Sequence, residues 1–209
     1  TAVRTVAERT RAAGGRALVV GGAVRDRLLG LQSPDYDVEL FGISPDNVTG
    51  LVHGMGIVHD VGRAFGILAC RLTDGTLHLS LPRRESKVAP GHRGFRVGTD
   101  PTLSYAEAAR RRDFTINAIA EDPLTGELLD PFRGQADLAA NVLRVMEPRT
   151  FGDDPLRVLR GAVFAAQFAL QVDAETDAAI KNTASSLREL PKSRVGEEWR
   201  KLLLRPQQP

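Results

Sequence analysis

Two aspartates separated by one residue, Asp35 and Asp37, are the side chains of this sequence whose spacing most directly suggests chemistry. Asp37 begins a segment, Asp37–Phe41, in which polar and apolar residues alternate as in a half-buried strand, and Asp35 lies just before it. Residues two apart on a strand project from the same face, so we expect the two carboxylates to converge. Such a pair can hold two Mg²⁺ ions about 3.5–4 Å apart, one activating an attacking hydroxyl and one steadying a leaving pyrophosphate. By spacing alone, a turn or a solvated strand end is the commoner explanation.

A glycine turn lies upstream of the acidic pair. The apolar run Ala17–Val20 predicts a strand that ends in Gly21–Gly22, and Ala23–Leu29 then predicts a short helix. Glycines let a backbone approach a phosphate closely, a helix N-terminus favours an anion, and Arg25 can clamp it. Gly21, Gly22 and Arg25 are therefore candidate nucleotide-binding residues, although a Gly-Gly pair alone is only a turn in most proteins.

Two further local patterns extend the mixed region. Segments Gly66–Leu72 and Thr76–Leu81 flank Asp74–Gly75, a strong signal for a β-hairpin turn. Ser104–Arg111 predicts a helix, because Ser104 and Glu107 have the spacing of a capping box.

From about Ala139 the sequence becomes helical in character. Pro155 suits the first turn of a helix. Two apolar stripes at helical spacing follow; they are Leu156, Leu159, Val163 and Val195, Trp199, Leu202. We predict an α+β fold: a small head with a mixed β-sheet flanked by helices, residues 1–138, and an all-helical neck, residues 139–209. The chain begins at Thr1 without a methionine and ends within an amphipathic stripe, so we expect it to be truncated.

Composition limits the function classes. The 209 residues are 42% hydrophobic and 26% charged, with a net charge of +2, which fits a soluble globular protein. No apolar run approaches the roughly 18 residues needed to span a bilayer, and no signal-peptide pattern is present. The lone Cys70 argues against disulfides and cysteine-based metal sites and favours a reducing cytoplasm. Arginine outnumbers lysine 24 to 4, which suits phosphate and base recognition but also fits GC-rich codon usage.

Four motifs, in order along the chain, resemble those of tRNA nucleotidyltransferases and bacterial poly(A) polymerases, within the polymerase-β-like nucleotidyltransferase superfamily. They are Gly21-Gly22-Ala23-Val24-Arg25-Asp26-Arg27-Leu28-Leu29-Gly30 with Asp35-Tyr36-Asp37, Arg111-Arg112-Asp113-Phe114-Thr115-Ile116-Asn117-Ala118, Asp130-Pro131-Phe132-Arg133-Gly134 with Asp137-Leu138, and Asp153-Asp154-Pro155-Leu156-Arg157. Four ordered motifs make a chance resemblance unlikely.

The resemblance implies roles for further residues. One aspartate and one arginine of the neck read the incoming base in this family without a nucleic-acid template, and the matching positions are Asp154 and Arg157. Asp accepts from the exocyclic amine of C or A while Arg donates to the adjacent ring acceptor, so the pair should reject G and U. Arg112 and Arg160 match further nucleotide-binding arginines. Without the resemblance, an N-cap aspartate and a surface arginine would be the simpler interpretation.

A basic segment, Arg83–Phe95 with Gly91 and Gly94, resembles the flexible loop that is implicated in the switch from adding C to adding A. A solvated basic loop is the alternative. Four positions depart from the family pattern: His78 for an acidic residue, Val163 for a frequent arginine, Asp153 for glutamate, and Ser193 before Arg194, where Glu-Arg is usual, with Glu198 and Lys201 retained.

The leading hypothesis is stepwise transfer of CMP and AMP from CTP and ATP to the 3′ end of tRNA, with release of pyrophosphate. It implies Asp35 and Asp37 as catalytic metal ligands, Mg²⁺ (with Mn²⁺ as a substitute) as cofactor, tRNA as partner and no membrane or protein partner. The alternatives are a poly(A) polymerase, a relative adding only C or only A, and a non-catalytic RNA-binding relative.

Overall fold

The computed structural model describes residues 1–62, 67–73, 75–87 and 95–204. Within them the chain divides into two compact units, each built from several segments. Unit 1 comprises Thr1–Ser86, Arg96–Ala109 and Asn117–Pro131, and unit 2 comprises Lys87–Phe95, Arg110–Ile116 and Phe132–Pro209. From the sequence we place one boundary between head and neck, after Leu138, whereas each of the two units contains several segments of the chain. The boundary after Leu138 stays a prediction.

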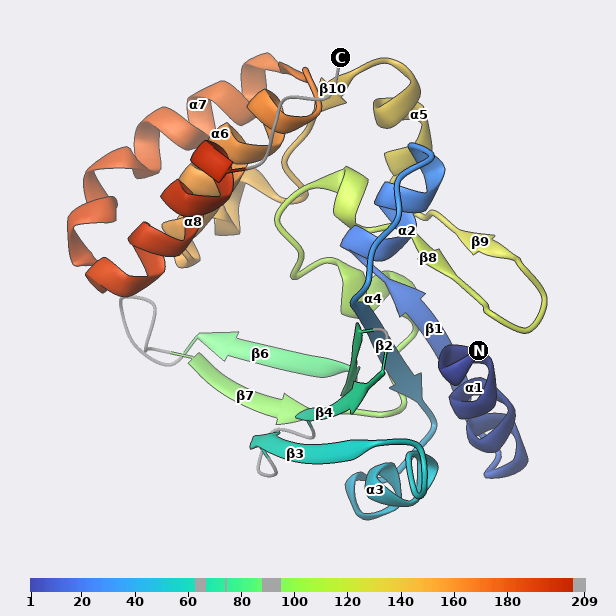
Figure 1. Cartoon of the computed structure of the whole chain (residues 1–209). Helices are drawn as coiled ribbons and strands as arrows, with labels where there is room; N and C mark the ends of the chain where they lie inside the picture. Colours follow the sequence, from blue (N-terminus) through green and yellow to red (C-terminus); the bar gives the residue numbers. More distant parts are fainter. Residues whose placement is uncertain (63–66, 74, 88–94, 205–209) are drawn as a thin grey trace. The chain divides into compact units, whose positions relative to one another are not determined.

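Unit 1 is built on a mixed sheet (Figure 1). Its seven strands have the order β3-β4-β5-β2-β1-β8-β9, in which β2 and β5 are parallel and the other neighbours are antiparallel. The strands are β1 (Arg16–Val20), β2 (Tyr36–Phe41), β3 (Ile57–Gly62), β4 (Ile67–Leu72), β5 (Gly75–Ser80), β8 (Ala120–Glu121) and β9 (Leu128–Leu129).

Short helices flank this sheet. They are α1 (Ala2–Ala12), α2 (Gly22–Leu28), the 3-10 turn η1 (Pro45–Asn47), α3 (Val48–Leu51) and α4 (Tyr105–Ala109). The core forms around β2 and β5, where Val38, Leu40, Leu77 and Leu79 are fully buried. The 3-10 turn η3 (Thr115–Asn117) lies in the segment where the chain passes from unit 2 back to unit 1.

The predicted elements of unit 1 are confirmed where the structure describes them. The strand–turn–helix of residues 17–29 corresponds to β1 and α2, and β4 pairs with β5 as an antiparallel hairpin. The capping box is present, because Ser104 Oγ accepts the Glu107 N–H at 3.3 Å and the Glu107 carboxylate accepts the Ser104 N–H at 2.9 Å. Gly66 and Asp74 of the predicted hairpin lie outside the described residues.

The basic segment differs from a simple loop. Its first residues form β6 (Arg83–Lys87), which pairs with β7 (Phe95–Thr99) in a two-stranded sheet. Pairing satisfies backbone groups that a solvated loop would leave to water. Arg84 Nη2 also forms an ion pair with Asp100 at 3.2 Å. Gly91 and Gly94 lie outside the described residues.

Unit 2 is mainly helical, as expected for the neck, with one short parallel pair of strands. Its elements are α5 (Gly134–Ala139), β10 (Val142–Leu143), η4 (Pro148–Asp153), α6 (Leu156–Gln167), β11 (Gln171–Val172), α7 (Ala174–Thr183), η5 (Ala184–Glu189) and α8 (Lys192–Leu204). Helix α6 packs against α7 and α8.

An aromatic cluster forms the centre of unit 2. Phe114 is fully buried, and its ring lies 5.9 Å, centroid to centroid, from each of the Phe151 and Phe164 rings. Gly161 of α6 permits this packing, because an added Cβ would lie 3.1 Å from the Phe114 ring. The segment Arg110–Ile116 is thereby part of the helical unit.

The second apolar stripe is helical, as predicted, but it is not a buried face. Val195 and Leu202 of α8 are partly exposed, and the Trp199 side chain is 50% exposed. The buried residue of this helix is Glu198, which accepts a hydrogen bond from Lys201 at 2.6 Å.

Candidate active site

The acidic pair lies at the start of the central strand β2. Asp35 immediately precedes the strand and Asp37 is its second residue, and both side chains are exposed. Asp37 is opposite Val20 of β1 and His78 of β5. Asp35 lies one residue before β2, so the convergence of the two carboxylates on one face stays a prediction.

The Asp35 carboxylate is held by the β4–β5 hairpin. The backbone N–H of Thr76 donates to Asp35 Oδ1 at 3.0 Å, and Ser33 Oγ donates to the Asp35 carbonyl oxygen at 2.9 Å. An ionised carboxylate offers about four acceptor sites, so this contact orients the group without exhausting its capacity for a cation.

The donor set suits Mg²⁺ better than a metal that needs an all-protein cage. Among the described residues, no group of three or more His, Cys, Asp or Glu side chains is arranged to hold a metal ion. Mg²⁺ is commonly held by one or two carboxylates together with substrate phosphates and water. Two exposed carboxylates at the start of β2 fit that requirement.

His78 occupies the position where the family pattern has an acidic residue. It pairs directly with Asp37 across the parallel β2–β5 ladder, and its side chain is partly buried rather than fully solvated. Glu39, two residues beyond Asp37, is fully buried. The alternation predicted from the sequence therefore occurs in a strand. The face of β2 that is exposed at Asp37 is buried two residues later, at Glu39.

The glycine turn joins β1 to α2. Gly21 has φ +75°, a left-handed conformation that favours glycine, and its N–H donates to the Ile119 carbonyl at 3.4 Å. Gly22 is the first residue of α2. The turn thus has the conformation that the Gly-Gly pair suggested, and its phosphate binding stays a prediction.

Arg25 is a buried brace in this structure. Its side chain is 5% exposed; Nε and Nη2 donate to Asp26 Oδ1 at 2.9 and 2.6 Å, and Nη1 donates to Asn117 Oδ1 at 2.6 Å. These contacts tie the glycine turn to a segment 92 residues away. Asn117 was not singled out from the sequence, although it lies in one of the four motifs. A phosphate clamp by Arg25 stays a prediction.

In unit 2, the predicted base-reading residues stand at the entrance to α6. Asp154 Oδ1 accepts the Leu156 N–H at 3.2 Å. Arg157 Nη1 and Nη2 donate to the carbonyl oxygens of Thr150 and Arg111 at 3.0 and 2.8 Å. Arginine has five N–H donors, so these two bonds orient the guanidinium and leave it donors for a ligand.

Arg194 supports the aspartate from the last helix. Its Nη2 lies 3.2 Å from Asp154 Oδ2, and the two side chains are 39% and 37% exposed. Ser193 at the preceding position therefore does not prevent α8 from contacting Asp154, a predicted base-reading residue. Arg194 belongs to the residue pair that is usually Glu-Arg in the family, so the sequence marks it as a candidate. Spacing could not identify Asp154, 40 residues away, as its partner.

Arg160 lies one turn beyond Arg157 and is tied to Asp113. Its Nε donates to Asp113 Oδ2 at 2.6 Å, and its guanidinium lies 5.1 Å from the Phe164 ring centroid. Burial acts to lower the pKa of Arg160, but Asp113, Glu198 and Asp154 outweigh it, so the pKa is raised above its usual value. The side chain therefore carries a permanent positive charge.

Two other positions of the family pattern, Arg112 and Val163, also lie in unit 2. Arg112 is partly buried in the segment Arg110–Ile116. Val163 is 4% exposed, within the core of unit 2. The buried valine packs in this core, and the effect of replacing the family's arginine stays a prediction.

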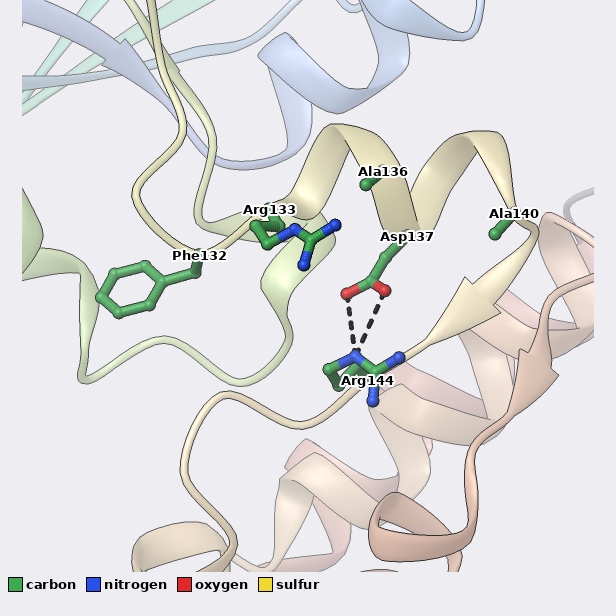
Figure 2. Close-up of a pocket in the computed structure, with 6 residues that line it drawn as sticks. All are labelled: Phe132, Arg133, Ala136, Asp137, Ala140 and Arg144. Carbon is green, nitrogen blue, oxygen red and sulfur yellow. Dashed lines mark hydrogen bonds and ion pairs between the residues drawn. The ribbon is translucent and has the colours of Figure 1, made fainter.

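A hollow of about 360 Å³ on unit 2 is lined by Phe132, Arg133, Ala136, Asp137, Ala140 and Arg144. Figure 2 shows these side chains. Asp137 points toward Arg144, whose Nε is 3.2 Å from both carboxylate oxygens. Asp137 also accepts from Thr115 Oγ1 at 2.6 Å, and Arg144 also pairs with Asp173. These contacts join two of the four motifs, which gives Asp137 a structural role.

Comparison with known protein families agrees with this architecture. Residues 17–144 match the model of the poly A polymerase head domain, and residues 169–208 match the model described as a probable RNA- and SrmB-binding site of polymerase A. A fold with a mixed-sheet head, an Asp-x-Asp strand and a helical neck defines a polymerase-β-like nucleotidyltransferase architecture. The chain belongs to the tRNA nucleotidyltransferase and poly(A) polymerase family.

Two curated relatives bear the name multifunctional CCA protein. The one from Nitrosococcus oceani is 42% identical over 186 residues, which is 88% of this chain and 43% of the relative. The one from Stenotrophomonas maltophilia is 42% identical over 191 residues, which is 89% of this chain and 45% of the relative. The chain thus spans less than half the length of these relatives.

Solved structures share the fold. The Bacillus stearothermophilus CCA-adding enzyme in complex with CTP is 28% identical, with a TM-score of 0.81 over 96% of this chain and 47% of that one. A tRNA nucleotidyltransferase complexed with a primer tRNA and an incoming ATP analog is 31% identical, with a TM-score of 0.75 over 93% of this chain and 55% of that one.

Proposed function

We propose that this chain is the nucleotide-transferring part of an enzyme that adds C and A to the 3′ end of tRNA, using CTP and ATP and releasing pyrophosphate. The observation that carries the proposal is the exposed Asp35/Asp37 pair at the start of β2, in a chain that matches the head-domain family from residue 17 to residue 144. The names of the relatives, and of the solved structures with CTP and tRNA, support this substrate class.

In this proposal, Asp35 and Asp37 are the catalytic residues and hold Mg²⁺, with Mn²⁺ as a substitute. When bound, the metal supplies charge stabilisation for the attacking 3′ hydroxyl and the departing pyrophosphate. The protein's own contribution is to place the two carboxylates two residues apart at the start of β2. The Gly21–Gly22 turn lets the backbone at the start of α2 approach the triphosphate closely, and Arg25 keeps that turn in place or contacts the phosphates directly.

Selection of the base rests on Asp154 and Arg157. The carboxylate accepts from the exocyclic amine that C and A share, and the guanidinium donates to the neighbouring ring acceptor; G and U offer the opposite order. Existing hydrogen bonds to Leu156, Thr150 and Arg111 orient the pair before a nucleotide binds. Arg112 and Arg160 add positive charge for the nucleotide.

The substrates of the complete protein are tested by a matrix of primers and nucleotides. Full-length protein is incubated with tRNA lacking its last three nucleotides, tRNA ending in CC and tRNA ending in CCA, each with one NTP at a time. The proposal expects C on the first, a single A on the second and nothing on the third. Long A tails would identify a poly(A) polymerase, and failure to add A to the tRNA that ends in CC would identify a C-adding relative.

Absence of any transfer would favour the non-catalytic RNA-binding alternative, which gel-shift binding of the same tRNAs would test.

In the described part of the chain, no helix is long and apolar enough to cross a membrane. A cytoplasmic location, the absence of a membrane or protein partner, and the division into head and neck after residue 138 stay predictions.

A further inference from the structure

The turn at the start of β5 approaches the backbone before Asp35 unusually closely. Gly75 has φ +151°, and a Cβ built on it would lie 1.8 Å from the Pro34 carbonyl oxygen and 2.7 Å from the Pro34 carbonyl carbon. Backbone atoms cannot yield as the end of a flexible side chain can. Only glycine therefore allows the hairpin to sit this close to Pro34.

This approach delivers a hydrogen-bond donor to the acidic pair. The next residue, Thr76, donates its backbone N–H to Asp35 Oδ1 at 3.0 Å across 41 residues of sequence. From the following position the parallel β2–β5 ladder begins, with Tyr36 opposite Leu77 and Asp37 opposite His78. Strand β5 thus fixes the backbone beside both aspartates and the carboxylate of one.

The geometry points to Gly75 and the Thr76 N–H as positioning elements that set the orientation of the Asp35 carboxylate toward its cation, an inference that rests on the proposed function. Mg²⁺ requires near-ideal octahedral geometry, so the direction of each ligand oxygen matters. Carboxylate ligands are commonly oriented by hydrogen bonds from outside the metal's own shell. Here a backbone amide supplies that bond, so position 76 tolerates different side chains while position 75 does not.

Two variants of the whole protein test this inference, each with a matched control. Gly75→Ala adds the obstructing Cβ, and its control is Gly50→Ala in α3 of the same unit, where an added Cβ meets nothing within 4 Å. Thr76→Pro removes the N–H donor, and its control is Thr76→Ala, which keeps it. Mn²⁺ binding is measured by electron paramagnetic resonance in the presence of CTP, together with the Mg²⁺ dependence of CMP transfer and the melting temperature.

We expect Gly75→Ala and Thr76→Pro to bind Mn²⁺ about 10–100-fold more weakly and to need correspondingly more Mg²⁺, the size of effect typical for loss of such a supporting bond. Both controls should match the unaltered protein, and excess Mg²⁺ should restore part of the transfer rate. A purely structural role would lower the melting temperature and leave the metal affinity of the folded protein unchanged; that result overturns the inference. If Gly75→Ala does not fold, Thr76→Pro decides, because it adds nothing at position 75.

Asp35→Ala separates this inference from the proposed function. Loss of Mn²⁺ binding in Asp35→Ala with unaltered binding in Gly75→Ala and Thr76→Pro would overturn the positioning role and leave the proposed function standing. Unaltered Mn²⁺ binding and transfer in Asp35→Ala would overturn the proposed function itself.

Discussion

Arg194 of the last helix donates a hydrogen bond to Asp154, which precedes α6, at 3.2 Å. Asp154 uses its other oxygen to accept the Leu156 N–H. The carboxylate proposed to read the base is therefore held from two sides, by its own helix and by α8. In the proposed function, a residue 40 positions away thereby helps to orient the base reader.

Arg194→Ala should weaken discrimination of CTP and ATP against UTP and GTP without unfolding the protein. Because both side chains are more than a third exposed, the pair contributes no more than about 1 kcal/mol to stability. Loss of its orienting effect should change the ratio of kcat/KM values by about tenfold or less, since 1.4 kcal/mol corresponds to tenfold. The measurement is single-nucleotide addition with each NTP. Arg200→Ala, an exposed position of the same helix, is the control and should keep the wild-type preference.

Arg157→Ala should have a larger effect on the same ratio and should also slow addition. Loss of one hydrogen-bonding partner of the bound base costs about 1–3 kcal/mol. Addition of each NTP to tRNA ending before CCA and ending in CC measures both quantities. An Arg157→Ala enzyme with an unchanged NTP preference would rule out this residue as a base reader.

Asp35→Ala and Asp37→Ala should each lower transfer by orders of magnitude, because a two-metal centre depends on both carboxylates. The fold and tRNA binding should persist, since both side chains are exposed. Circular dichroism and gel-shift binding check these two properties beside the transfer assay. Asp46→Ala, an exposed aspartate in η1, serves as the control. Near-normal turnover in a folded variant of Asp35 or Asp37 would contradict the assignment.

Arg25→Ala should lower the free energy of unfolding by about 1–3 kcal/mol, because it leaves the buried Asn117 side chain without the Arg25 donor and the partly exposed Asp26 carboxylate without its ion pair. Urea unfolding measures the difference. Arg27→Ala removes an ion pair with Glu121 in which the arginine is 53% exposed, so its cost should be less than about 1 kcal/mol. Equal, small losses in both variants would show that Arg25 is not a structural brace and would favour a direct contact with phosphate.

Shortening the segment between β6 and β7 should leave C addition intact and abolish the terminal A. Residues 88–94 carry Gly91 and Gly94, whose backbone freedom suits a rearrangement as the site changes from C to A. Sequencing the 3′ ends of product tRNA distinguishes ends in CC from ends in CCA. A shortened variant that still completes CCA would show that this segment does not control the switch.

Local patterns in the sequence determined much of this molecule. Alternation and glycine punctuation identified β1, β2 and the β4–β5 hairpin, and the Ser104/Glu107 spacing identified the start of α4. These features depend on residues within a few positions of one another, so a periodicity or a cap motif contains all the required information. The Asp35/Asp37 pair belongs to the same class, because its spacing of two residues is visible in the sequence, whereas the convergence of the two side chains stays a prediction.

The tertiary structure decided what covers each face and what holds each charged group. Glu39 continues the polar side of β2 yet is fully buried, Val163 lies in the core of unit 2, and Arg25 pairs with Asn117 from 92 residues away. The close approach of Gly75 to Pro34 likewise joins two turns that are distant in sequence. Burial and long-range hydrogen bonds depend on how the helices and strands pack together. A sequence pattern with a period of two or 3.6 residues shows which residues share a face, but not which element packs against that face. For that reason the sequence identified the acidic pair, and only the fold revealed the hairpin that orients it.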